Sequence, residues 1–152
     1  MTDSFIPLST PWLKGNEKEY LMECVDTGWI ATGPFIRCLE ESVSGYLGST
    51  DAVAVSSGTA ALHVALRLLE IGERHEVICP TATFVATTNS IIYTGARPVF
   101  LDSEPAAWGL DPVALNNFLA HECQRDPSGR VVDVQSGESV IESHLLSWAG
   151  AW

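Results

Sequence analysis

Short apolar segments alternate with longer stretches from residue 51 onward, and this alternation constrains the fold more than any other feature of the chain. The apolar segments are too short for helices, whereas the stretches between them have about the dozen residues typical of helices. The sequence predicts strands at 52–55, 76–79 and 98–101 and helices at 59–71, 84–93 and 112–121. Strands that are connected through helices run parallel in one sheet, so we expect an α/β architecture.

The first 50 residues have a different pattern, with two predicted helices and no strand. Residues 16–27 predict a helix that Asn16 can cap, and residues 28–34 predict a loop because they contain two glycines and a proline. A second helix is expected from Pro34, since proline fits the first turn of a helix. The expected inner faces hold Tyr20, Leu21, Cys24 and Val25, then Phe35, Cys38, Leu39, Ser42, Val43 and Tyr46.

Composition and charge limit the partners of the chain. Nineteen acidic against eight basic residues give a formal net charge of −11, which repels nucleic acid and anionic lipid head groups. The four cysteines form no CxxC pair and support neither a disulfide framework nor a metal site. The N-terminus lacks the pattern of a secretory signal, and no apolar run reaches the roughly 18 residues of a membrane span. We therefore expect a soluble, cytoplasmic protein.

The sequence Ser-Ser-Gly-Thr at residues 56–59 stands where the first predicted strand passes into a helix. The first amides of a helix lack carbonyl partners and lie at the positive end of its dipole, so such a turn can bind an anion. Gly58 allows a phosphate to approach closely, and the neighbouring hydroxyls can donate hydrogen bonds to it. Simple capping of the helix by Ser57 or Thr59 explains the same residues without a ligand. The turn alone leaves both interpretations open.

A second candidate position follows the predicted strand at residues 76–79, where Thr81, Thr83 and Phe84 occur. In open α/β sheets, ligands bind beyond the carboxyl ends of the strands. Phe84 can stack there on a planar cofactor, although an aromatic residue beside a strand is also a normal part of a core. Residues 124–139 predict an exposed hairpin or loop.

Four stretches of the chain follow one another in the order typical of one protein family. They read IPLSTPWLKGNEKEYLMECVDTGWIATGPF, VAVSSGTAALHVAL, EVICPTATFVATTNSIIYTGARPVFLD and WGLDP. From about residue 5 to about residue 138 the chain resembles the DegT family of pyridoxal-phosphate-dependent nucleotide-sugar aminotransferases. Within that family it is most similar to the branch that serves legionaminic-acid and related nonulosonic-acid pathways.

The resemblance implies a fold. It is the N-terminal part of the large domain of the aspartate-aminotransferase-like (fold type I) transferases that use pyridoxal phosphate. In the family a mixed, mostly parallel sheet carries the cofactor, and the active sites lie between the two subunits of a homodimer. We therefore expect one incomplete α/β domain over residues 1–152, with an arm and helices in 1–50 and the cofactor-binding portion in 51–138. Residues 139–152 form a tail that departs from the family pattern.

The resemblance also assigns residues to the site. One set of residues matches the family's cofactor site, which consists of the turn that holds the phosphate and the aromatic residue that stacks on the pyridine ring. A second set matches a segment at the active-site entrance. The expected cofactor-binding residues are Gly58, Thr59, Ala60 and Phe84, and the expected substrate-binding residues are Thr32 and Gly33. The implied cofactor is pyridoxal 5′-phosphate, and no metal is expected.

No catalytic residue is expected within the chain. An aminotransferase needs a lysine that holds the cofactor and moves protons, and a carboxylate against the ring nitrogen. The only lysines are Lys14 and Lys18, in a segment where the family has no catalytic lysine. The resemblance places the lysine and the carboxylate beyond residue 152. We therefore interpret the chain as a truncated, inactive fragment, with a natural short paralogue as the alternative.

The implied reaction transfers an amino group from an amino acid, usually glutamate, to a nucleotide-linked 4-keto-6-deoxy sugar. Such reactions serve the biosynthesis of surface polysaccharides or nonulosonic acids. Two other functions fit the same residues. The chain can be a non-catalytic phosphate-binding or cofactor-binding module that pairs as a decoy subunit with a full-length homologue. It can also belong to a sugar dehydratase of the same family, in which a histidine replaces the lysine.

Overall fold

The structure, a computed structural model, describes residue 7 and residues 9–141 of the chain. It divides into two compact units, residues 1–54 and residues 55–152, and each is described here by itself. Most of the tail expected at residues 139–152, including His144, Leu145 and Leu146, lies outside the described residues.

Unit 1 contains the two predicted helices, α1 (Glu17–Thr27) and α2 (Pro34–Leu47). Each helix ends at a glycine with positive φ, Gly28 at 75° and Gly48 at 65°, which is the usual left-handed helix end. Asn16 occupies the position before α1 but does not cap it, because no side-chain cap bond forms and its amide nitrogen lies 3.3 Å from the Tyr20 hydroxyl. The two helix positions predicted from the sequence are therefore confirmed. The prediction that Asn16 caps the first helix is wrong.

The apolar faces of α1 and α2 meet each other but bury little. The rings of Tyr20 and Phe35 lie 4.9 Å apart, in an apolar groove of about 800 Å³. No residue of either helix is buried, and Tyr46 is 90 % exposed. The predicted inner face of α2 is thus largely a surface, because an amphipathic helix hides its apolar stripe only when another layer covers it.

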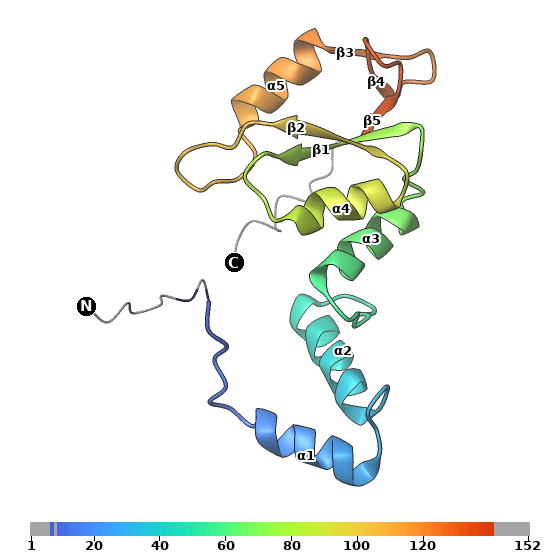
Figure 1. The fold of residues 1–152 in the computed structure, drawn as a ribbon. Coiled ribbons are helices and arrows are strands. Elements are labelled where there is room, and N and C mark those ends of the chain that lie inside the picture. Colours follow the sequence, from blue (N-terminus) through green and yellow to red (C-terminus); the bar gives the residue numbers. More distant parts are fainter. Residues whose placement is uncertain (1–6, 8, 142–152) are drawn as a thin grey trace, which may run out of the picture. The chain divides into compact units, whose positions relative to one another are not determined.

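Unit 2 contains a five-stranded mixed sheet within the described residues (Figure 1). The strands are β1 (His75–Pro80), β2 (Arg97–Leu101), β3 (Cys123–Arg125), β4 (Val131–Asp133) and β5 (Ser139–Ile141), in the order β2-β1-β5-β4-β3. β1 runs parallel to both of its neighbours, whereas β4 runs antiparallel to β3 and β5. The parallel pairing of β1 with β2 through a helix is the one the sequence predicts.

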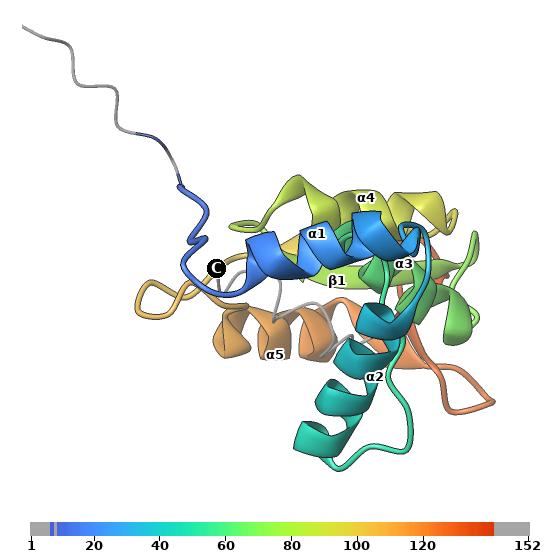
Figure 2. The ribbon, with the colours of Figure 1, turned by 90° about the horizontal axis from the view of Figure 1, so that it is seen from below.

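Helices cover both faces of this sheet, as Figures 1 and 2 show. On one face α3 (Gly58–Leu68) and α4 (Val85–Tyr93) form a core in which Leu66 and Ile91 pack with Val77 and Cys79. On the other face α5 (Pro112–His121) places Phe118 against Ile78. Consecutive residues of β1 thus serve opposite cores, because side chains alternate along a strand.

Three sequence predictions for residues 52 onward need correction. Residues 52–55 form no strand, and Val53 is 79 % exposed. A strand needs a neighbour for its backbone groups, and none pairs with these residues in the described part of the chain. Helix α3 ends at Leu68 rather than at residue 71, since Glu70 adopts a left-handed φ of 60°. Residues 124–139 include the predicted hairpin, but it is built into the sheet, with Asp133 buried.

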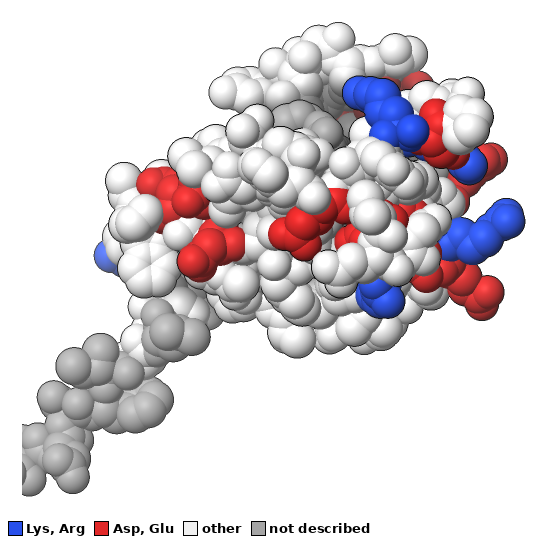
Figure 3. Space-filling model, turned by 90° about the horizontal axis from the view of Figure 1, so that it is seen from above, with Lys and Arg blue, Asp and Glu red and all other residues white. Residues whose placement is uncertain are grey.

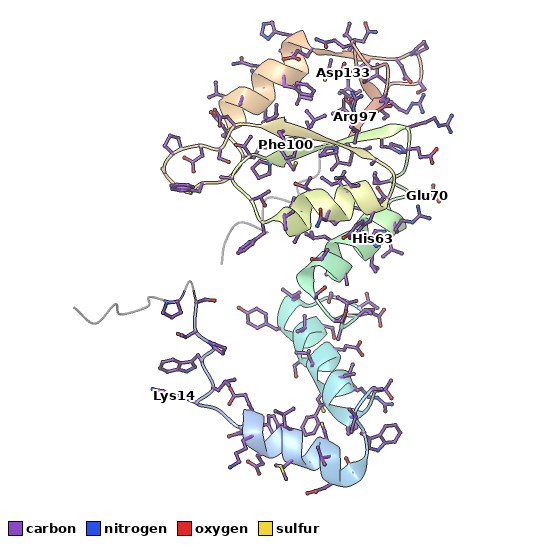
Figure 4. All side chains as sticks on the ribbon, in the orientation of Figure 1. Lys14, His63, Glu70, Arg97, Phe100 and Asp133 are labelled. Atoms are coloured by element: carbon purple, nitrogen blue, oxygen red, sulfur yellow. The ribbon has the colours of Figure 1, made fainter. Side chains whose placement is uncertain are left out.

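An ion pair between a buried carboxylate and an exposed guanidinium joins β1 to β2. Glu76 is completely buried and forms a salt bridge with Arg97, its register partner on the next strand. The Arg97 guanidinium also lies 4.0 Å from Glu138 and faces the charge of Asp133 (Figure 4). The hydrogen bond that Arg97 donates to the Glu76 carboxylate, and these negative charges, raise the pKa of Arg97. Because one Glu76 oxygen lacks a hydrogen-bond partner, the cation carries most of the compensation for this buried charge.

Removal of the cation alone is expected to cost more than removal of both charges. Arg97→Met leaves the buried Glu76 carboxylate without its cation, so the free energy of unfolding should fall. In a Glu76→Gln background the same substitution should cost clearly less, since no buried charge remains. Urea unfolding of the four proteins measures both values. Equal losses in the two backgrounds would show that the ion pair is not what holds Glu76 in the sheet.

The turn between β3 and β4 is held by one carboxylate. Asp126 accepts hydrogen bonds from the Ser128 hydroxyl at 2.6 Å and from the Arg130 amide at 3.0 Å, and it pairs with the Arg130 guanidinium at 2.8 Å. These interactions, the Ser128 hydroxyl first, hold the pKa of Asp126 well below its ordinary value. The charged form of Asp126 is therefore part of the folded hairpin.

Acid should loosen this hairpin before it affects the core. Because the pKa of Asp126 is lowered on folding, its contribution is complete above the unfolded value of about 3.9 and is lost as the pH falls below it. Amide shifts of Ser128 and Arg130, followed by NMR as the pH falls from 6, should stay unchanged through the range in which an ordinary aspartate titrates and should move only below it. Asp126→Asn should abolish the transition, and an ordinary midpoint in the unmutated chain would contradict this account of the turn.

Candidate functional site

The carboxyl ends of β1 and β2 carry two loops that are bonded to each other. The amide of Thr81 donates to the Leu101 carbonyl at 2.9 Å, and the amide of Ala82 donates to the Ser103 hydroxyl at 3.2 Å. Asp102 accepts from the Ser103 amide at 3.1 Å, which fixes the start of the second loop. The loop after β1 and the loop after β2 therefore form one connected edge of the sheet, where ligands bind in open α/β folds.

An open pocket of about 330 Å³ lies at this edge, lined by Ala82, Thr83, Phe84 and Trp108. Phe84 immediately precedes α4 with an extended backbone, and 58 % of its surface is exposed. The interpretation that Phe84 belongs to a core is therefore wrong. Its ring is free to contact a ligand, and the Thr83 hydroxyl lies 2.9 Å from that of Thr87 in the first turn of the helix.

The turn at residues 56–60 lies at the amino-terminal end of α3. Ser57 caps the helix, since its hydroxyl accepts from the Ala60 amide at 3.2 Å and its carbonyl accepts from the Ala61 amide at 3.0 Å. Among the described residues, the amides of Gly58 and Thr59 have no hydrogen-bond partner. A Cβ at Gly58 would meet no atom within 4 Å, so the space beside it is open. Capping and anion binding thus use different amides of the same turn.

The predicted site residues are divided between the two units. Gly58 and Phe84 lie at the starts of α3 and α4, two helices that share a core and an edge contact of His63 with Tyr93, with ring centroids 5.8 Å apart. None of the turn residues lines the pocket beside Phe84. Thr32 and Gly33 belong to unit 1, where Gly33 precedes α2 with φ 146°. A Cβ there would lie 2.8 Å from that of Trp29, so Gly33 is also required by the local backbone.

Among the residues that the structure describes, no charged side chain lines the pocket beside Phe84. On the face shown in Figure 3, acidic side chains lie between broad uncharged areas, and basic side chains form no continuous patch. Burial raises the pKa of Cys79 to about 11, so its thiol, beneath α3 and α4, stays protonated and is no nucleophile. Within the part of the chain that the structure describes, no metal-binding group of side chains occurs and no helix is long and apolar enough to cross a membrane.

Trp108 is the pocket residue that sequence reasoning assigned no role. It stands in the stretch WGLDP, which precedes the predicted helix at residues 112–121. Its place in the same pocket lining as Phe84 depends on how the loop after β2 folds back, through a bridge of Ser103 with Leu110. The sequence shows only that Trp108 is an aromatic residue one loop away from the candidate stacking residue Phe84. It does not show that the two residues line one pocket.

The comparisons with known proteins agree on one family. Residues 11–125 match the model of the DegT/DnrJ/EryC1/StrS aminotransferase family. EpsN of Bacillus subtilis (strain 168), described as a pyridoxal phosphate-dependent aminotransferase, is 48 % identical over 97 % of this chain and 39 % of its own length. GDP-perosamine synthase of Caulobacter vibrioides is 43 % identical over 75 % of this chain and 31 % of its own length.

Solved structures give the same result. Spr1654 of Streptococcus pneumoniae, described as a sugar aminotransferase, superimposes in its form with pyridoxamine phosphate (PMP) with a TM-score of 0.66 and 35 % identity. That superposition covers 74 % of this chain and 28 % of Spr1654, and the α/β fold expected from the sequence is confirmed. The chain spans well under half the length of the relatives it matches. On the sequence match, the fold and the order of its elements, the chain belongs to the DegT/DnrJ/EryC1/StrS aminotransferase family.

Proposed function

We propose that these residues are the cofactor-binding portion of a sugar aminotransferase that uses pyridoxal 5′-phosphate. The observation that carries the proposal is the exposed start of α3, where the amides of Gly58 and Thr59 are unpaired among the described residues. Two unpaired amides at the positive end of a helix dipole bind an anion without rearrangement. The family membership of the chain supports a phosphate ester as that anion.

The residues of the turn fit a phosphate group. The hydroxyl of Thr59, which has no hydrogen-bond partner among the described residues, can donate a third hydrogen bond beside the two amides. Gly58 is exposed and leaves the approach to the turn open. Ala60 contributes a small side chain rather than its amide, because Ser57 already occupies that amide. Hydrogen bonds to a charged acceptor are about twice as strong as neutral ones, so these few groups are enough for binding.

Phe84 is the proposed contact for the pyridine ring. Its exposed face at an open pocket supports this role, since ring stacking adds binding energy and fixes orientation. When bound, pyridoxal 5′-phosphate supplies an electron sink next to the carbon that exchanges the amino group. The contribution of the described residues is to hold the phosphate at one end and the ring at the other.

The acceptor in this proposal is a nucleotide-linked 4-keto-6-deoxy sugar, and the amino donor is glutamate. The names of GDP-perosamine synthase and of SpsC, a spore coat polysaccharide biosynthesis protein that is 40 % identical, support a sugar of surface polysaccharides. Thr32 and Gly33 are the proposed residues at the active-site entrance. A homodimer in the cytoplasm is the proposed setting, and free thiols at Cys24 and Cys38 are consistent with a reducing compartment.

The 152 residues are not expected to complete the reaction by themselves. Lys14 and Lys18 are the only lysines, and both belong to unit 1, ahead of or within α1. The Lys14 ammonium lies over the ring of Trp12, at 4.2 Å from the ring centroid. The portion therefore binds the cofactor, and catalysis requires a lysine that these residues do not supply. A non-catalytic module remains the second candidate, favoured by the same observation.

Thr59→Val tests the phosphate site. Valine keeps the volume of threonine but removes the hydroxyl, so the affinity of the chain for pyridoxal 5′-phosphate should fall about tenfold. Binding is measured by equilibrium dialysis, with pyridoxal, which lacks the phosphate, as the second ligand. The weaker binding of pyridoxal should not change, because the lost hydrogen bond is made only to the phosphate.

Ser57→Ala is the matched control. It removes the cap of α3 and should lower the free energy of unfolding by about 1 kcal/mol, with little effect on affinity. Thr59→Val should show the reverse pattern, a stability change within about 0.5 kcal/mol and a loss of affinity. Equal affinities of the Thr59→Val and unmutated chains would mean that the turn only caps the helix, and the proposed site would have to be abandoned.

A further inference from the structure

Trp108 has a backbone conformation that its side chain disfavours. Its φ is 61°, in the left-handed region, and the only other described residue with a positive φ besides glycines is Glu70. Glu70 follows the end of α3, where a left-handed residue is ordinary (Figure 4). Trp108 lies in a loop, and a bulky residue there is an outlier that costs conformational energy.

The indole of Trp108 does not repay this cost within the described chain. Trp108 is 68 % exposed, so packing within the described chain buries little of its apolar surface. Tryptophan loses more than any other residue when its large apolar surface stays in water. A strained backbone that presents an exposed indole is typical of a ligand contact, where strain is retained for positioning.

The loop around Trp108 is fixed by Glu104. The Glu104 carboxylate accepts from the amides of Ala106, at 2.8 Å, and Ala107, and its carbonyl accepts from the Trp108 amide at 3.1 Å. Its own amide donates to the Gly109 carbonyl at 3.0 Å, which closes the loop. These four hydrogen bonds at Glu104 hold the left-handed turn, so Trp108 is already in position before a ligand binds. Little conformational entropy is therefore lost on binding.

The pocket that Trp108 shares with Phe84 selects an uncharged ring. Ala82 and Thr83 complete the lining, and the Thr83 hydroxyl already contacts that of Thr87. No cation is present to hold a phosphate, and no amide or guanidinium side chain is present to read the edge of a nucleobase.

We propose that Trp108 is a sugar-binding residue whose indole packs against the C–H face of the 6-deoxyhexose, at the same pocket whose Phe84 side is left to the ring of the cofactor. The aliphatic face and methyl group of a deoxy sugar gain dispersion and hydrophobic contact on an aromatic surface without any buried charge. This inference rests on the proposed function for the identity of the sugar. It goes beyond that function by assigning the acceptor to the loop after β2.

Ligand-detected NMR tests the inference on the 152-residue chain, with the methyl glycoside of 6-deoxymannose as the probe. Saturation transfer should reach the ring and methyl protons in the unmutated chain and in Trp108→Phe, which keeps an aromatic face. Trp108→Gly should weaken binding about tenfold, the typical effect of losing one aromatic stacking partner. Trp12→Gly, which removes a 76 % exposed indole in unit 1, should leave the signal unchanged.

The glycine variant also separates binding from folding. Glycine adopts a positive φ without strain, so the urea midpoint of Trp108→Gly should equal or exceed that of the unmutated chain. A lower midpoint together with unchanged sugar binding would make Trp108 structural and overturn the inference. Guanosine serves as a second probe, and its saturation transfer should not depend on Trp108. If saturation transfer to guanosine, rather than to the glycoside, depends on Trp108, the pocket binds a nucleobase and the inference is wrong.

Pyridoxal 5′-phosphate binding, measured on the same samples, distinguishes the two proposals. Cofactor binding without Trp108-dependent sugar transfer would overturn this inference and leave the proposed function in place. Sugar transfer that depends on Trp108 without cofactor binding would support the sugar site and count against the proposed function. If the unmutated chain shows neither, both are wrong.

Discussion

β1 is the element on which unit 2 depends, because it is the only described strand with parallel neighbours on both sides. Five of its six residues are buried, and their side chains alternate between the two cores. Such a strand must satisfy its backbone groups through β2 and β5 or lose free energy at each unpaired group. The Glu76 carboxylate adds a second requirement, since only Arg97 on β2 balances its charge. Displacement of β2 would therefore cost hydrogen bonds and an ion pair together.

The site inherits its rigidity from this arrangement. Pro80 ends β1 opposite Leu101 of β2, and the bond of the Thr81 amide to Leu101 continues the pairing by one step beyond the strands. The loops that follow begin side by side, so Phe84 and Trp108 can line one pocket although they are far apart in the sequence. Because the loops are bonded to each other at Ala82 and Ser103, each wall limits the motion of the other.

The sequence predicted what depends on local pattern and failed where the outcome depends on distant partners. Asp111 and Pro112 marked the start of α5, and the Asp111 carboxylate does accept from the Val113 amide at 2.8 Å. Residues 52–55 have strand composition but no strand beside them, and no local pattern reveals that lack. In the site, the resemblance indicated Phe84 before its exposure was known. Trp108 was missed because the spacing of residues in the sequence reveals neither its left-handed φ nor the fact that its loop lines one pocket with Phe84.

The candidate site separates charge from apolar contact. The turn at Gly58 and Thr59 offers amides to an anion, whereas the pocket at Phe84 and Trp108 has no group that could compensate one. A phosphate placed against the two rings would lose its hydration without new hydrogen bonds, at a cost of several kcal/mol. An uncharged ring at the start of α3 would leave the two amides unpaired. Each part of the candidate site therefore disfavours the ligand group that suits the other.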